Sequence, residues 1–185
     1  MTASLAAVSE PVLETERLRL RRLDENDAGF ILRLVNDPDW LRYIGDRGVR
    51  TIEDAKRYIA SGPAAMHERH GFSLLAVERK HEPGPIGICG LIRRETLPDV
   101  DIGFAFLPDF RGAGYALEAA WAVLPWARDV LKLPRLIAIA SVDNARSRSL
   151  LEKIGLPFER TLRLPGESRD VAVHGVTWRA ADAAD

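Results

Sequence analysis

A glycine-containing segment, Phe110-Arg111-Gly112-Ala113-Gly114-Tyr115-Ala116, separates a strand-like apolar run at 102–107 from a helix-like run at 117–126. Two glycines allow a sharp turn from strand to helix and expose successive backbone N–H groups. The first turn of the following helix adds the positive end of the helix dipole. The segment is therefore typical of a site that binds a phosphate or pyrophosphate group without a metal ion.

Two familiar phosphate-binding loops do not match this segment. The dinucleotide fingerprint requires a third glycine three residues after the second, but that position is Leu117, and no acidic residue follows at the distance needed to hold a ribose. The P-loop requires Lys followed by Ser or Thr, which the segment lacks. A different phosphate-bearing ligand is therefore expected.

The spacing that remains, Arg111-x-x-Gly114-x-Ala116, resembles the acyl-CoA pyrophosphate loop of the GNAT N-acetyltransferase superfamily. A second segment, Asn144 to Gly155, reads Asn-x-x-Ser followed by Leu-Glu-Lys-x-Gly and is similar to the fourth-helix signature of the RimJ/RimL branch. The segments Thr15 to Arg21 and Asn36-Asp37-Pro38 fit the same branch. The resemblance covers residues 12–178 and rests on two motifs in the expected order.

That resemblance implies a single acyl-CoA N-acyltransferase domain at 12–178, between a flexible N-terminal tail at 1–11 and a C-terminal tail at 179–185. The implied fold is α/β (α+β), with a mixed, mostly antiparallel sheet of six to seven strands flanked by about four helices. It also implies that the sheet splays open between its fourth and fifth strands, where the acyl-CoA enters.

Local patterns agree with this element order. Alternating and β-rich runs predict strands at 16–22, 72–78, 86–93, 100–107, 136–140, 158–164 and 171–178. Asp24, Thr51 and Asn144 are expected to cap helices, and Pro125 predicts a kink or an early end of the helix that follows the glycines. The first strand carries alternating arginines that form either a basic patch or, as we favour, its solvated face: Arg17, Arg19 and Arg21.

Acetyl-CoA is the cofactor that the resemblance implies. The backbone of Phe106 and Leu107 would pair with the pantetheine arm. The pyrophosphate would be held by the N–H groups of Arg111, Gly112, Ala113, Gly114, Tyr115 and Ala116. Asn144 and Ser147 would contact the pantetheine from the next helix, and the alternative for Asn144 is a helix cap alone.

Amine acetylation requires few protein groups. The amine must be neutral to attack a thioester, the developing oxyanion needs a hydrogen-bond donor, and the thiolate leaves with little acid assistance. Asp101 is the best candidate base, because strand alternation places it on one sheet face with Gly103 and Ala105; the alternative is a solvated aspartate at a strand end. There are three weaker candidates for deprotonating the amine: Glu95, a water relay and Glu118. For Glu118 a structural hydrogen bond is the favoured role.

Two aromatic residues of the early helices are candidates for the acceptor site. Trp40 and Tyr43 are expected to form one wall of the acceptor pocket, and core packing is the alternative. The remaining reactive side chains are assigned structural roles, with no metal site: His67, His70, Cys89 and His174.

Composition limits the classes of function. The formal net charge of −1, from 26 basic and 27 acidic residues, provides no global field for nucleic acid or an anionic membrane. A lone cysteine and the lack of a long apolar run favour a cytoplasmic protein. We expect an N-acetyltransferase for a small amine, a polyamine or a protein N-terminus, and a homodimer is allowed. The alternative is a catalytically silent acyl-CoA-binding sensor or assembly domain, because Leu151 replaces the tyrosine that many members use as an acid.

Overall fold

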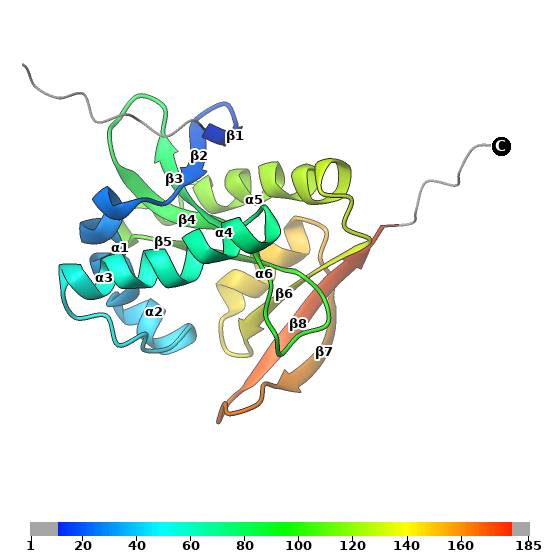
Figure 1. Ribbon diagram of the computed structural model, residues 1–185. Coiled ribbons are helices and arrows are strands. Elements are labelled where there is room, and N and C mark those ends of the chain that lie inside the picture. The colour runs from blue at the N-terminus through cyan, green and yellow to red at the C-terminus, as the bar shows by residue number, and fades with distance from the viewer. Residues whose placement is uncertain (1–10, 179–185) are drawn as a thin grey trace, which may run out of the picture.

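The computed structural model describes residues 11–178, and one eight-stranded sheet forms its centre (Figure 1). The strands are β1 (Pro11–Glu14), β2 (Leu18–Arg22), β3 (Leu74–Arg79), β4 (Pro85–Ile92), β5 (Asp101–Phe106), β6 (Arg135–Ser141), β7 (Phe158–Arg163) and β8 (Asp170–Thr177). They lie in the order β1-β2-β3-β4-β5-β6-β8-β7, and every neighbouring pair is antiparallel except β5 and β6. The mixed, mostly antiparallel sheet is therefore confirmed.

The sheet has one strand more than the upper number expected, because the chain enters it early. β1 begins at Pro11, inside the predicted tail, and pairs with β2. It spans four residues with an irregular register between Pro11 and Leu13, so its alternation is too short to recognise in the sequence. Residues 1–10 of the predicted N-terminal tail and the whole predicted C-terminal tail at 179–185 lie outside the described residues.

The parallel strands β5 and β6 separate almost as soon as they meet. Asp101 and Ile137 form the one register pair between them in the described chain, and the Ile137 N–H donates to the Val100 C=O at 3.1 Å. Towards Phe106 and Ser141 the two strands run on without pairing. This is the splay expected between the fourth and fifth strands, counted from the predicted strand at 16–22.

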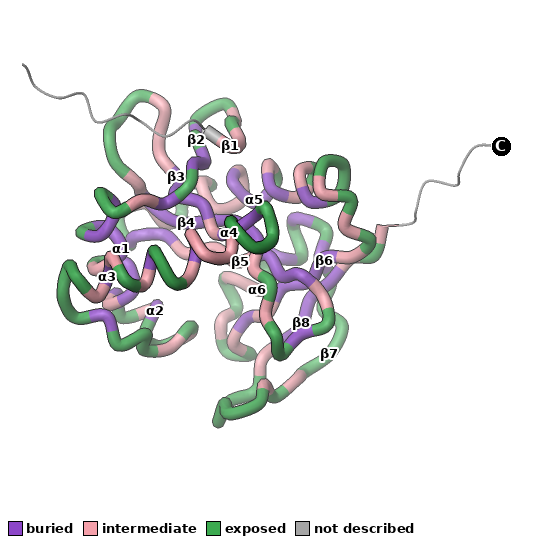
Figure 2. Tube along the Cα trace, in the orientation of Figure 1, coloured by how far each residue is buried: buried purple, intermediate pink, exposed green. Residues whose placement is uncertain are grey.

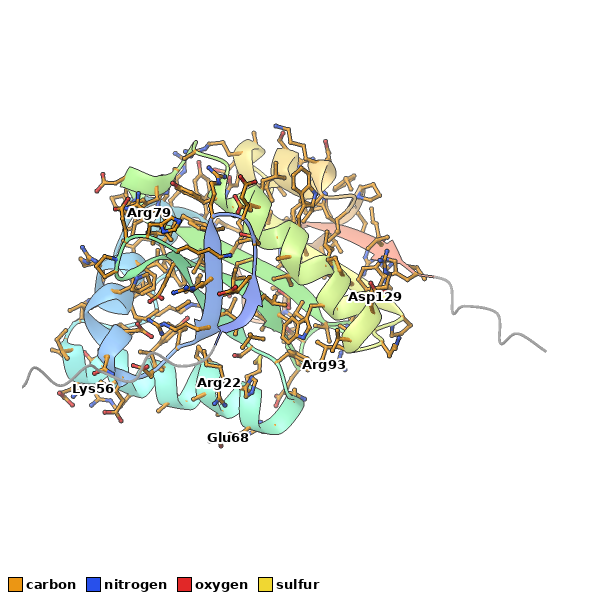
Figure 3. All side chains as sticks on the ribbon, turned by 90° about the horizontal axis from the view of Figure 1, so that it is seen from above. Arg22, Lys56, Glu68, Arg79, Arg93 and Asp129 are labelled. Atoms are coloured by element: carbon orange, nitrogen blue, oxygen red, sulfur yellow. The ribbon has the colours of Figure 1, made fainter. Side chains whose placement is uncertain are left out.

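Helices cover both faces of the sheet (Figure 1). One face carries α1 (Ala28–Val35), α2 (Pro38–Tyr43), α3 (Ile52–Ile59) and α4 (Ala65–His70), and the other carries α5 (Tyr115–Pro125) and α6 (Ala145–Lys153). The view from above in Figure 3 places strands between α5 and the α3–α4 run, whose outer side carries Lys56 and Glu68. Between residues 11 and 178, no helix combines the length and apolar character needed to cross a membrane.

Two main apolar cores separate the layers, and Figure 2 shows the central strands largely buried, with exposed helical surfaces around them. Successive residues of β3 alternate between them: Leu75 and Val77 belong to the core under α5 and α6, and Ala76 to the core under α1–α3. Both faces of the central strands are therefore packed, so a ligand site must lie where the strands separate.

Arg21 corrects the expected solvated face of β2. Arg17 and Arg19 are exposed, as expected, but Arg21 is only 8% exposed. Its guanidinium donates to both oxygens of Asp27 at 2.8 Å and to Glu78 at 2.6 Å. These acidic partners come from other segments of the chain, so alternation within the strand does not reveal them.

Prolines coincide with a change of helical type. A π-helical turn at Ala60–Ala64 contains Pro63 and joins α3 to α4, and a second one at Trp126–Val130 follows Pro125. Proline lacks the N–H that would continue the α-helical ladder, and a π turn accommodates the mismatch. The α-helix after the glycines ends at Pro125, as predicted from that residue, although the chain stays helical to Val130.

Candidate active site

A cavity of ≈ 990 Å³ at the splay brings together most of the residues that the sequence singled out. The predicted site residues on its wall are Trp40, Tyr43, Asp101, Phe106, Arg111, Gly112, Gly114, Tyr115, Ala116, Asn144 and Ser147. Leu107 and Ala113 are not part of the lining.

The glycine loop presents a row of backbone donors at the N-terminus of α5. Gly112 and Gly114 have φ values of 78° and 82°, a left-handed conformation that glycine adopts without strain. In the described part of the chain, no acceptor engages the N–H groups from 112 to 116, which lie at the positive end of the α5 dipole. This geometry suits a bound pyrophosphate.

Arg111 supports this loop instead of offering its own groups to a phosphate. Its backbone N–H donates to the Pro108 C=O at 3.2 Å, and its Nε donates to the Phe106 C=O at 2.9 Å. Its terminal nitrogens donate to Asp37 at 2.5 Å and to Asp39 at 2.7 Å, at the start of α2. The expected contact of Arg111 with the pyrophosphate is therefore not favoured, and its side chain instead ties the loop to α2.

The end of β5 keeps one of the two backbone sites expected for the pantetheine arm. The Leu107 N–H donates to the Ile86 C=O and the Leu107 C=O accepts from the Phe110 N–H, both at 3.0 Å, so the pantetheine contact expected of Leu107 is not favoured and stays a prediction. Polar groups of successive residues in an antiparallel ladder point to opposite edges, so those of Phe106 point to the splay. The Phe106 C=O already accepts from Arg111, which leaves its N–H for a ligand.

Asn144 acts as a helix cap at the open end of the splay. Its Oδ1 accepts a hydrogen bond from the Ser147 N–H at 3.1 Å, and Gly155, with φ of 88°, follows the other end of α6. The capping role of Asn144 is confirmed. A cofactor contact of Asn144 or Ser147 remains a prediction, which their position on the cavity wall allows.

Glu118 joins the N-terminal hairpin to the glycine loop. It accepts hydrogen bonds from the Thr15 hydroxyl at 2.5 Å and from the Arg17 N–H and Nε at 2.9 and 2.6 Å. Arg17 also donates to the Ala113 C=O at 3.1 Å and lies 4.6 Å from the centre of the Tyr115 ring. Burial tends to raise the pKa of Glu118, but these hydrogen bonds lower it below its usual value. Glu118 is therefore a structural carboxylate, as favoured from the sequence.

Asp101 lies at the vertex of the splay and is only 1% exposed, which excludes a solvated strand end. Ile102 belongs to the core under α5, whereas Ala105 packs against the core under α1–α3, so Asp101 faces the α1–α4 side. Its two oxygens accept from the Arg94 Nε at 3.0 and 3.2 Å. Burial raises the pKa of Asp101 to about 6, and Arg94 limits that rise. A carboxylate of this kind in a cavity has the properties of a general base.

The two predicted aromatic residues differ in their environment. Trp40 is buried in the core under α1–α3 and donates its indole N–H to the Gly45 C=O at 3.1 Å. Tyr43 is half-buried, and the Arg42 guanidinium lies 4.9 Å from the centre of its ring. Trp40 therefore has the core role that was the alternative from the sequence, while both residues also reach the cavity wall.

Sequence reasoning missed several residues of the cavity wall, among them Arg47, Tyr58 and Arg94. Arg94 follows β4, and the pairing of Ile92 with Asp101 brings it beside that carboxylate. The only signal in the sequence is a basic residue directly after a strand, which is common on protein surfaces. Its partner becomes visible only once the strand register is known.

Other reactive side chains have structural environments. Cys89 is buried, and burial raises the pKa of its thiol to about 12. The buried His174 ring has its Nδ1 3.0 Å from the Leu156 C=O. Glu95 is exposed and outside the cavity lining. Across the described chain, no group of three or more His, Cys, Asp or Glu side chains gathers as a metal site.

Known proteins resemble this chain over most of its length. A family model described as an acetyltransferase (GNAT) domain matches residues 17–157. The uncharacterized N-acetyltransferase YoaA of Bacillus subtilis is 31% identical over 156 residues, covering 83% of this chain and 86% of that protein. The crystal structure of an acetyltransferase from Agrobacterium tumefaciens shares 25% identity, with a TM-score of 0.77 over 96% of this chain and 100% of its own.

Some structural neighbours were solved with coenzyme A or acetyl-CoA bound. RimL, a ribosomal L7/L12 alpha-N-protein acetyltransferase in complex with coenzyme A, has a TM-score of 0.68 and 17% identity. The match covers 91% of this chain and 98% of the RimL chain. At that identity the likeness concerns the fold.

Proposed function

Because the chain belongs to the GNAT acetyltransferase family, we propose that it transfers the acetyl group of acetyl-CoA to a primary amine by direct attack in a ternary complex. Family membership makes it an N-acyltransferase. We therefore propose, in addition, which amine is the acceptor and which residues bind it and the cofactor.

One observation carries this proposal: a row of backbone donors suited to a diphosphate and a buried carboxylate line the same cavity. The N–H groups of 112–116 hold the pyrophosphate at the N-terminus of α5. The pantetheine arm follows the splayed edge of β5, where it meets the Phe106 N–H, with Asn144 and Ser147 on the opposite wall. The thioester then lies towards Asp101.

The amine attacks from the α1–α4 side, where Trp40 and Tyr43 contribute to the wall. Asp101 accepts a proton from the ammonium group, and the freed nitrogen forms a bond to the carbonyl carbon. The C–S bond breaks, and coenzyme A leaves as a thiolate whose thiol pKa of about 8.5 makes it a competent leaving group. The thiolate takes up one proton, so an ammonium substrate yields an amide, a thiol and one proton in solution.

We propose three acceptor types for testing: a protein N-terminus, which the RimJ/RimL-like motifs favour, a polyamine, and a small amine. We also propose a cytoplasmic location, where the lone Cys89 stays reduced. Trp121, 54% exposed on α5, is the proposed contact of a homodimer.

The test is release of free thiol from acetyl-CoA across a panel of amines and N-terminal peptides. Turnover with at least one acceptor is expected, with mass spectrometry showing an acetylated product. Tight CoA binding with no turnover on any acceptor would instead support the catalytically silent sensor.

A further inference from the structure

Near Asp101, where the amine is proposed to bind, the cavity wall carries guanidinium groups that have no role in the proposed transfer step. Arg94 is 29% exposed and lines the cavity, and only its Nε is engaged by Asp101. Within residues 11–178 its two terminal nitrogens have no acceptor. Four N–H donors of a fixed positive charge therefore remain beside the proposed base.

Arg47 adds a second positive charge on the same side. It lines the cavity and makes no ion pair or side-chain hydrogen bond with any residue in 11–178. Arg94 and Tyr58 line the same cavity as Arg47. Burial raises the pKa of the Tyr58 hydroxyl, and the charges of Arg47 and Arg94 both lower it, which agrees with their sharing one wall.

These arginines lie at the wrong end of β5 to serve the pyrophosphate. Asp101 begins β5 and the glycine loop follows its end at Phe106, so the Asp101–Arg94 pair and the loop are separated by roughly 17 Å of strand. Other cations also line the cavity, namely Arg111 of the glycine loop, Arg146 and Lys153 of α6, and Arg169. The charges near Asp101 therefore remain for the acceptor.

Resting on the proposed function, we propose that the acceptor is an amine that carries a carboxylate close to the reacting nitrogen. Asp101 binds the ammonium group, and the terminal nitrogens of Arg94, with Arg47, bind the carboxylate. The Nε of Arg94 lies within 3.2 Å of both Asp101 oxygens, so the two groups of the acceptor are held a few bonds apart. Polyamines, which carry several positive charges and no negative one, are poor acceptors at this site.

Matched acceptor pairs test this inference with the unmodified protein. Each amino acid is compared with its amide, and a peptide beginning with Asp with one beginning with Asn. The amide has the less basic amine and so more of the neutral form, so a preference for the acid does not arise from amine reactivity. We expect kcat/KM to be about tenfold to a hundredfold higher for the acid, the size of a charge-assisted hydrogen bond.

A preference for the acid in either pair supports the inference, and the pair in which it occurs identifies the type of acceptor. Preference for the free amino acid assigns a small-molecule acceptor, whereas preference confined to the Asp peptide assigns an acidic protein N-terminus. Equal turnover of acids and amides, or faster turnover of polyamines, overturns this inference alone. Absence of turnover with every amine overturns the proposed function as well.

Substitutions of Arg47 and Arg94 test whether these side chains cause the preference for the acid. Arg47→Gln should reduce the acid-to-amide ratio of kcat/KM about tenfold with unchanged KM for acetyl-CoA, and Arg94→Gln should reduce it further. Arg94→Lys keeps a charge beside Asp101 but loses the forked donors, so the acid-to-amide ratio of kcat/KM should fall in this variant as well. Arg93→Gln is the matched control, because Arg93, labelled in Figure 3, donates to the Pro98 C=O and lies outside the lining. A ratio unchanged in the Arg47 and Arg94 variants would refute these roles.

Discussion

Replacing Gly114 by aspartate would place a carboxylate where the pyrophosphate is proposed to bind. A Cβ at this position meets only Arg17 Nη2, at 3.4 Å, which is an ordinary contact. The left-handed φ of 82° adds about 1–2 kcal/mol of strain for a residue with a Cβ, and Asp and Asn tolerate it best. One unit charge about 4 Å from a phosphate charge, at an effective dielectric constant of about 20, weakens binding by about 4 kcal/mol, or roughly 1000-fold. The fold should therefore survive while CoA affinity is lost.

The assay is calorimetric titration with CoA at low and high salt, together with thermal unfolding of the same samples. Gly114→Asn is the matched control, because it adds the same shape and backbone strain without the charge. It should weaken CoA binding no more than about tenfold, the size of one strained or lost hydrogen bond. The loss in the aspartate variant should also shrink at high salt. Equal CoA affinity of the two variants would refute the assignment of the loop.

Asp101→Asn should lower kcat about 100-fold or more at unchanged KM for acetyl-CoA, and should remove the rise of kcat/KM with pH through about 6. A raised carboxyl pKa makes the native state of the wild type lose stability as the pH rises from about 4 to 6. In urea unfolding at pH 8, Asp101→Asn should therefore be more stable than the wild type by up to about 3 kcal/mol. Arg111→Gln should lower the free energy of unfolding by about 2 kcal/mol, because it leaves Asp37 buried without its cation. Arg111→Lys should not restore this stability, because one ammonium group does not span the three acceptors of the guanidinium. Glu118→Gln should lower the melting temperature by about 2–4 °C at pH 7. The difference should shrink as the pH falls below the usual carboxyl pKa of about 4, because a lowered carboxyl pKa gives stability that is lost as the pH falls.

Features that depend on neighbouring residues could be predicted from the sequence. Gly112 and Gly114 mark the loop because only glycine adopts their conformation without strain, and Asn144 marks its helix because the cap bond spans three residues. The position of Asp101 on its sheet face follows from alternation alone. The glycine loop, the cap and the candidate base are therefore predictable from local sequence patterns.

Features that depend on pairing across the fold could not be predicted. Arg111 donates to Asp37 and Asp39, which lie 74 and 72 positions away in the sequence, and its motif gives no indication of these partners. Arg21 was expected in solvent because its acidic partners belong to other segments. Arg94 was missed for the same reason, although it contacts Asp101, the candidate base.

Because β5 and β6 share a single register pair, the open edge of β5 has a defined length. From Asp101 to Phe106 the strand spans about 17 Å at roughly 3.3 Å per residue, and the gap closes where Asp101 meets Ile137. A cofactor arm laid along this edge has a fixed stop, because paired strands leave no path beyond the vertex. An acyl group longer than acetyl must then turn out of the sheet towards the acceptor. In the proposed mode of binding, the point at which the two strands meet would determine how far an acyl group can extend along the sheet.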